Sequence, residues 1–134
     1  MSDELYQARI VALAKSKTGA GKLAAPTKSA RRDNPLCGDR VTIDVKVEDG
    51  RIAEIAHQVR GCLLCQASAA ALAGAAVGRD AAGVAELRHD AERAIGREEG
   101  KAHDPFDAFE PVANHKSRHE CVLLPFEALK DALS

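Results

Sequence analysis

The sequence is poor in aromatic residues: among 134 residues it has no tryptophan, one tyrosine and three phenylalanines. Proteins that bind single-stranded nucleic acids stack the bases on aromatic side chains, so this composition argues against that class. The formal net charge of −1 also disfavours a nucleic-acid partner. The hydrophobic core must therefore be built mainly from alanine, valine, leucine and isoleucine.

Long hydrophobic runs are also missing. The alanine-rich segment around residues 67–77 falls well short of the roughly 18 consecutive apolar residues that a membrane span needs. The N-terminus opens with polar residues and lacks the basic, apolar and small-residue order of a signal peptide. We therefore expect a soluble protein of the reducing cytoplasm, without a membrane partner, whose four cysteines are not held in disulfides.

A chain of this length suits a single domain over residues 1–134, large enough to bury roughly two thirds of its unfolded surface. Near its start, Tyr6, Ile10 and Leu13 fall on one face of a predicted helix. Residues 19–36 contain two glycines and two prolines without a sustained period. They are predicted to form an extended loop that leads to the first cysteine.

Alternating polarity then predicts a β-hairpin. Valine or isoleucine occupies every second position from Val41 to Val47, Asp49-Gly50 suits a turn, and a second β-like run extends to Val59. Polar residues stand between the apolar ones, which is typical of an antiparallel sheet with one face in water.

The rest of the chain is predicted to be mainly helical. An alanine-rich helix should begin near Cys62 and end at Gly78. Another helix is indicated by Asp80 as its cap and by Gly96 as its stop.

Residues 97–117 are predicted to be an irregular, charged insertion with one short helical turn around Phe106 and Phe109. A last helix should follow, with Pro125 in its first turn, where the missing amide hydrogen does least harm. Cys121 would then lie at the helix start or just before it. The apolar face of this helix comprises Phe126, Leu129 and Leu133.

Three cysteines fall at the ends of predicted elements: Cys37 in a loop, Cys62 at a strand-to-helix junction, and Cys121 at a helix start. Helix N-termini present unpaired amide hydrogens and a partial positive charge, which favour thiolate over thiol. Gly38 would let the backbone approach a metal, and Asp39 could add an oxygen ligand beside the sulfurs. From the residues alone, an Asx-type hydrogen bond that closes the loop is the preferred role of Asp39.

The fourth cysteine, Cys65, completes a Cys-x-x-Cys sequence with Cys62. Such a pair also occurs in redox enzymes and as half of a zinc ribbon, but no second pair and no thioredoxin-like βαβ pattern accompanies it. Cys65 is therefore either a small buried side chain or an extra thiol that can exchange with a ligand.

Four motifs follow one another along the chain: Cys37-Gly38-Asp39, Gly61-Cys62, Ala67-Ser68-Ala69 and Arg118-His119-Glu120-Cys121. Their order resembles the U-type iron-sulfur cluster scaffold family, the IscU, NifU and SufU group, over roughly residues 2–133. The resemblance implies an α+β fold in which a small antiparallel three-stranded sheet packs against helices, the SufE/NifU-like sandwich.

The resemblance implies a scaffold that accepts sulfur from a cysteine desulfurase, binds iron and a labile [2Fe-2S] cluster, and transfers the cluster to recipient proteins. Carried over by position, Cys37, Asp39, Cys62 and Cys121 are its ligands, for iron, for the cluster or for zinc. The aspartate is expected to make the cluster labile, because iron exchanges an oxygen ligand more readily than a thiolate. Cys37 and Cys121 are the candidate persulfide acceptors.

Such a protein is more a scaffold than an enzyme. The alternative is a zinc-dependent sulfurtransferase that relays persulfide sulfur from the desulfurase without building a cluster. The interpretation as a purely structural zinc module is less well supported, because a chain of this length has enough hydrophobic core to fold without metal.

Two features place the chain within this group. The 58 residues between Cys62 and Cys121 resemble the SufU-like branch, which carries an insertion there. The Leu-Pro-Pro-Val-Lys run with which the shorter branch engages its Hsp70 chaperone is absent before Cys121, so an Hsp70-type partner is not expected.

Four further residues fall close to the expected ligands in the sequence. His119 is a candidate ligand because it lies two residues before Cys121, and His57 is a weaker one. Lys116 and Arg118 either steady a thiolate or persulfide or belong to the solvated surface.

Overall fold

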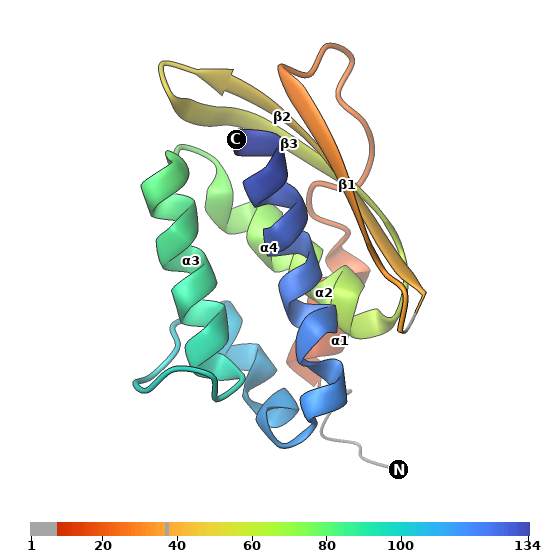
Figure 1. The fold of residues 1–134 in the computed structure, drawn as a ribbon, viewed down its shortest axis with the longest axis vertical. Helices are drawn as coiled ribbons and strands as arrows, with labels where there is room; N and C mark the ends of the chain where they lie inside the picture. The colour runs from red at the N-terminus through yellow and green to blue at the C-terminus, as the bar shows by residue number, and fades with distance from the viewer. Residues whose placement is uncertain (1–7, 37) are drawn as a thin grey trace.

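The computed structural model describes residues 8–36 and 38–134, so expectations for Tyr6 and Cys37 lie outside the described residues. Three strands form one antiparallel sheet in the order β1-β2-β3 (Figure 1). None of the described helices is long and apolar enough to cross a membrane. The elements in chain order are α1 (Ala8–Ser16), β1 (Lys28–Asn34), β2 (Asp39–Glu48), β3 (Arg51–Arg60), α2 (Leu63–Ala76), α3 (Ala81–Ala94), the 3-10 helices η2 (Phe106–Asn114) and η3 (Lys116–Arg118), and α4 (His119–Leu133).

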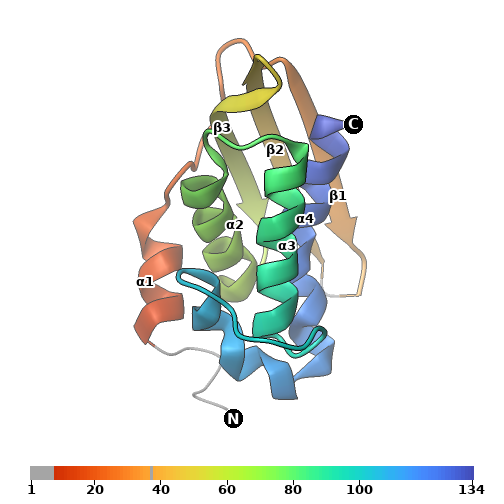
Figure 2. The same ribbon diagram turned by 90° about the vertical axis from the view of Figure 1, so that its left-hand side faces the viewer.

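Helices cover one face of the sheet. α2 and α4 contact the strands directly, α1 packs beside α2, and α3 lies outside them against α4 and η2 (Figure 2). The alternation expected for β2 is present, since Val41, Ile43 and Val45 are buried under the helices. The fold is α+β, as the resemblance implied.

The few aromatic side chains are all used in the core, apart from the tyrosine outside the described residues. Phe106, Phe109 and Phe126 are at most 1% exposed. The rings of Phe106 and Phe126, with centroids 5.6 Å apart, join the insertion to α4. The helical turn predicted around Phe106 and Phe109 is thus present, as η2.

One strand lies inside the segment expected to be a loop. β1 pairs with β2 from Lys28↔Val45 to Asn34↔Asp39, so the loop expectation for residues 19–36 is wrong over this part. β1 is an edge strand in which only the side chains of Ala30 and Asn34 are shielded from solvent, so its sequence shows no alternation of apolar residues. Pairing with β2, not burial of apolar side chains, makes this segment a strand.

The helices after β3 begin and end near their predicted residues. α2 starts directly after Cys62. α3 is capped by Asp80, whose Oδ1 accepts a hydrogen bond from the Gly83 amide at 2.8 Å. The ends of α3 agree closely with the prediction because both carry local signals, Asp80 at the start and Gly96 after the end.

α4 begins earlier than predicted. It starts at His119, so Cys121 lies in its first turn and Pro125 in its interior, not in the first turn as expected. The proline removes one main-chain hydrogen bond, the one to the Cys121 carbonyl. Residues 121–126 are all buried, and this packing outweighs the missing bond.

Candidate metal centre

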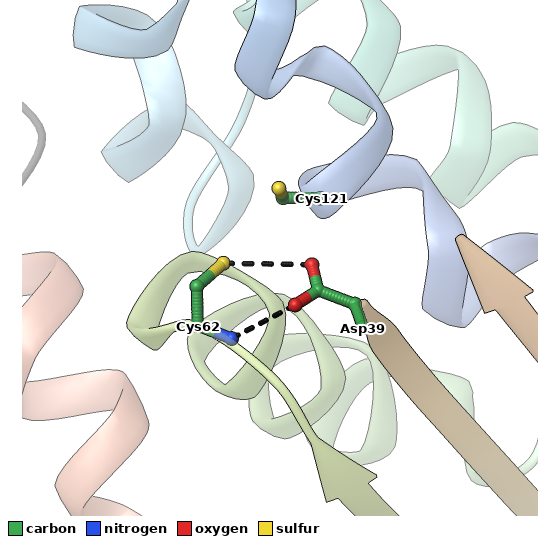
Figure 3. A group of neighbouring side chains, drawn as sticks. All are labelled: Asp39, Cys62 and Cys121. Atoms are coloured by element: carbon green, nitrogen blue, oxygen red, sulfur yellow. Dashed lines mark hydrogen bonds between the residues drawn. The ribbon is translucent and has the colours of Figure 1, made fainter. Parts of the chain in front are cut away.

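Three residues from distant parts of the chain meet at one end of the sheet (Figure 3). Asp39 opens β2, Cys62 precedes α2, and Cys121 lies in the first turn of α4. A carboxylate oxygen of Asp39 and both sulfur atoms lie within 4.8 Å of one another. Asp39 and Cys121 are buried and Cys62 is partly exposed, so the group opens to solvent on the Cys62 side.

Cys37 lies outside the described residues, but its loop is framed on both sides. Because Asn34 pairs with Asp39, residues 35–38 form the connection between β1 and β2. The Asn34 carbonyl accepts a hydrogen bond from the Gly38 amide at 2.8 Å, and its side-chain oxygen accepts one from the Leu36 amide at 3.1 Å. The loop that carries Cys37 therefore ends directly beside the carboxylate of the site.

An Asx-type hydrogen bond in this loop is made by Asn34. Gly38 has a φ of +71° and a Cβ there would meet nothing within 4 Å, so it supplies a left-handed turn conformation rather than a close approach.

The glycine that permits a close approach is Gly61. A Cβ at this position would lie 2.5 Å from Oδ1 of Asp39. The same oxygen accepts a hydrogen bond from the Cys62 amide at 3.0 Å, and Oδ2 lies 3.6 Å from the Cys62 sulfur. The sequence analysis missed this role, although a glycine just before a cysteine at a strand-to-helix junction was a usable signal.

The two cysteines have opposite protonation preferences. The pKa of Cys62 is lowered to about 7, first because the Cys121 thiol donates a hydrogen bond to its sulfur, and next by the amides of Cys65 and Leu64 at the start of α2. Burial and the charge of Asp39 oppose this shift. The pKa of Cys121 is raised by its hydrogen bond to Cys62, by burial and by the charge of Cys62. Of the two sulfurs, Cys62 is therefore the one that loses its proton more readily.

This donor set suits a borderline metal ion. Metal bonds of about 2.0 to 2.3 Å place the ligand atoms of a tetrahedral zinc or iron ion roughly 3.3 to 3.8 Å apart. The separation between the Cys62 sulfur and Oδ2 of Asp39, 3.6 Å, is already in this range. Two soft sulfurs and one hard oxygen fit zinc and iron.

Neither histidine proposed as a ligand joins this group among the described residues. Nδ1 of His119 accepts a hydrogen bond from Nε of Arg97 at 3.2 Å, so Nε2 carries the proton and donates it to the Ala113 carbonyl. His119 thus ties the insertion to the start of α4. Nε2 of His57 is bound to the Thr18 carbonyl at 2.7 Å, and burial lowers the pKa of His57.

The remaining candidates lie around the group rather than in it. Cys65 is fully buried in the hydrophobic core, which favours its structural role over ligand exchange. Lys116 is exposed and Arg118 is half-buried in η3, the short helix that leads into α4.

Residues 5–132 match the NifU-like N-terminal domain. The chain belongs to this family. The NifU-like chain is 31% identical over 132 residues to a protein of Thermotoga maritima named iron-sulfur cluster assembly scaffold protein IscU, covering 96% of this chain and 92% of the relative. A protein of the same name from Streptococcus pyogenes serotype M1 is 28% identical over 138 residues, with 98% of this chain and 84% of the relative covered.

Two solved structures share the NifU-like fold along almost their whole length. The N-terminal part of a nitrogen-fixing NifU-like protein from Brucella abortus superposes with a TM-score of 0.88 at 33% identity, covering 98% of this chain and 93% of the other. FiSufU from Fervidobacterium islandicum AW-1 superposes with a TM-score of 0.91 at 27% identity, covering both chains completely. The resemblance found in the sequence is therefore confirmed, including its SufU-like side.

Proposed function

We propose that this protein is a scaffold on which a labile [2Fe-2S] cluster is assembled and from which it is transferred to recipient proteins. The observation that carries the proposal is the convergence of Asp39, Cys62 and Cys121, with ligand atoms within 4.8 Å, at the ends of three elements. Cys37, on the loop beside Asp39, completes the proposed ligand set. The names of the similar proteins from Thermotoga and Streptococcus support the same function.

Each described residue has a distinct part in this proposal. Cys62 binds iron first, because it is partly exposed and its pKa is about 7. Cys121 follows when its proton is released to solvent. Asp39 supplies the oxygen ligand, which iron exchanges more readily than a thiolate, and so it keeps the cluster transferable.

Sulfur reaches the site as a persulfide carried by a cysteine desulfurase. A thiolate of this chain attacks the outer sulfur of the donor persulfide, the donor's sulfur–sulfur bond breaks, and the donor cysteine leaves as a thiolate. Of the two candidate acceptors, Cys121 is poorly suited in this conformation, because it is 0% exposed and its pKa is raised. Cys37 is the remaining candidate, and the exposure and lowered pKa of Cys62 make it a second one.

The same donor set also fits the second candidate function. Two sulfurs and a carboxylate at these spacings suit tetrahedral zinc, so a zinc-dependent sulfurtransferase would use the same residues. In both functions the partner is a cysteine desulfurase and the expected setting is a reducing cytoplasm. Only the scaffold also needs recipient iron-sulfur apoproteins.

Anaerobic reconstitution separates the two functions. The purified protein is incubated with iron, cysteine, a cysteine desulfurase and a thiol reductant, which supplies the two electrons that convert persulfide sulfur to sulfide. Its metal and sulfide contents and visible spectrum are then measured. We expect equal amounts of bound iron and sulfide in the wild type and in Cys65→Ala, and loss of both in Cys62→Ser and Cys121→Ser. Stoichiometric zinc that resists replacement, with persulfide but no bound sulfide, would establish the sulfurtransferase instead.

A further inference from the structure

The outer edge of β3 is partly occupied by the chain's own backbone. β3 ends the sheet, and a short segment after α1 pairs with it in parallel through Ala20↔His57. The His57 amide donates to the Gly19 carbonyl at 2.7 Å, and the His57 carbonyl accepts from the Gly21 amide at 2.9 Å. The main-chain polar groups of His57 therefore point away from β2.

Val59, two residues further along β3, must present its main-chain groups in the same direction, because these groups alternate along a strand. The register shift in this strand pair lies at Lys46/Val47, outside this stretch. Within residues 8–36 and 38–134, neither the amide nor the carbonyl of Val59 has a hydrogen-bond partner. From this pairing the chain passes over the end of the sheet to β1 (Figure 2), and among the described residues this segment pairs with β3 only at His57.

A groove of about 400 Å³ runs along this open edge. Its walls are formed by the end of α1 with residues 17–21, by residues 57–59 of β3, and by Gln66 of α2. Nε2 of Gln66 donates to the Gly61 carbonyl at 3.0 Å, so the groove ends beside the residue that precedes Cys62. An unpaired edge and a groove thus lead directly to the partly exposed thiol of the site.

Positive charge lies in and near the groove. Lys17 lines it, whereas Arg60, the residue after Val59, lines two neighbouring hollows, one of them together with Asp33 and Asp39. Both side chains are exposed. Among the described residues neither has an ion-pair partner, and no acidic residue lines the groove. Two unpaired cations beside open main-chain groups favour a strand that carries carboxylates.

We propose that an extended acidic segment of the sulfur donor adds to β3 at Val59 as a short parallel strand, with its carboxylates paired to Lys17 and Arg60. This inference rests on the proposed function. The added strand lies about 4.8 Å from β3 and continues the direction of Gly19 to Gly21. A residue two positions past the one paired with Val59 lies about 6.6 Å further on, next to Cys62. A persulfide-bearing cysteine at that position can reach the acceptor thiolate.

Amide exchange tests the strand pairing directly. The ¹⁵N-labelled protein is studied by NMR with and without a cysteine desulfurase, and persulfide on the chain is followed by mass spectrometry. We expect at least tenfold slower exchange of the Val59 amide in the complex. The Ser29 amide, which the strand pairing directs to the free edge of β1 at the other side of the sheet, should exchange at an unchanged rate.

Two pairs of variants test the same contact by affinity. Val59→Pro removes the outward amide at an edge position where proline is tolerated, and it should weaken desulfurase binding at least tenfold, whereas Ser29→Pro should not. Lys17→Glu and Arg60→Glu should each weaken binding several-fold, with a smaller effect at high salt. Lys101→Glu, an exposed charge reversal in the insertion, is the matched control.

The results separate the docking site from the function. Desulfurase binding and persulfide transfer with unchanged Val59 exchange would overturn the docking site alone. A folded Val59→Pro protein that binds the desulfurase as tightly as the Ser29→Pro protein does would also overturn the docking site alone. If Val59→Pro does not fold, the docking site is tested by amide exchange in the wild type and by the desulfurase affinity of the charge-reversal variants. A wild type that neither binds the desulfurase nor gains persulfide would overturn both the proposed function and the docking site.

Discussion

Replacing Gly61 by alanine should damage both the stability of the protein and its candidate metal centre. The added Cβ would lie 2.5 Å from Oδ1 and 2.9 Å from Cγ of Asp39. An unstrained contact between a carbon and a non-bonded oxygen needs roughly 3.3 Å, so the carboxylate must move by about 0.8 Å. Asp39 is only 2% exposed, and its movement stretches the 3.0 Å hydrogen bond from the Cys62 amide.

The expected cost follows from this overpacking. Inserting a methyl group into a filled site costs about 1 to 3 kcal/mol. With an unfolding entropy of roughly 2.1 cal/mol/K per residue, this corresponds to a Tm about 4 to 11 °C lower for a chain of this length. Displacing a ligand that is fixed by its neighbours should also weaken metal binding by about 10- to 100-fold.

The matched control is Gly74→Ala on α2. Its Cβ would meet only Cγ2 of Thr18, at an ordinary 3.7 Å, so this variant should gain about 1 kcal/mol from helix propensity. Thermal melts of the metal-free proteins and zinc titrations of both variants provide the comparison. A Gly61→Ala protein with the Tm and zinc affinity of the wild type would refute the argument that this glycine is required for the carboxylate to reach Cys62.

Three further predictions concern protonation and cluster release. In the metal-free protein, the alkylation rate of Cys62 should rise through about pH 7 while Cys121 stays unlabelled, as peptide mass spectrometry can show; equal labelling would contradict the shared hydrogen bond. Asp39→Ala should hold a reconstituted cluster longer in a transfer assay, yet melt earlier because the Cys62 amide loses its acceptor, at a cost of about 1 to 3 kcal/mol. Although burial opposes it, hydrogen bonds from His103 lower the pKa of Asp90 in the folded protein. This carboxylate therefore stabilises the fold above its ordinary pKa of 3.8, and the contribution is lost as the pH falls below 3.8 through the lowered pKa. Asp90→Asn should therefore lose less stability than the wild type on acidification, and identical acid denaturation curves would count against this.

The parts of the fold that were predictable carry their signal locally. The alternation from Val41 to Val47 reflects a strand with one face buried, and Asp80 caps α3 through a hydrogen bond to a residue three positions away. β1 has no such signal, because the exposed sequence around Arg31 becomes a strand only when β2 is beside it.

The candidate site was predictable only where its residues carry a local sequence signal. Cysteines at element ends indicated thiolate chemistry, but the placing of Asp39 needed the family resemblance, because its carboxylate meets Cys62 only in the folded chain. The start of α4 was misplaced because Pro125 is a strong local signal that tertiary packing overrides. The pairing of His119 with Arg97 spans 22 residues and has no local pattern at all.

The convergence of positions 39, 62 and 121 also has a consequence for the lifetime of the protein. An ion bound by these atoms would cross-link three distant points of the chain. It would join the ends of two long segments, residues 39–62 and residues 62–121, the second with 58 residues between its two cysteines. Ligand present at one hundred times its dissociation constant adds about 2.7 kcal/mol to the stability of a folded chain. Proteases that cleave unfolded chains would then degrade the metal-free protein faster than the metal-bound protein. The degradation rate of the protein would therefore depend on the supply of the metal or cluster that it binds.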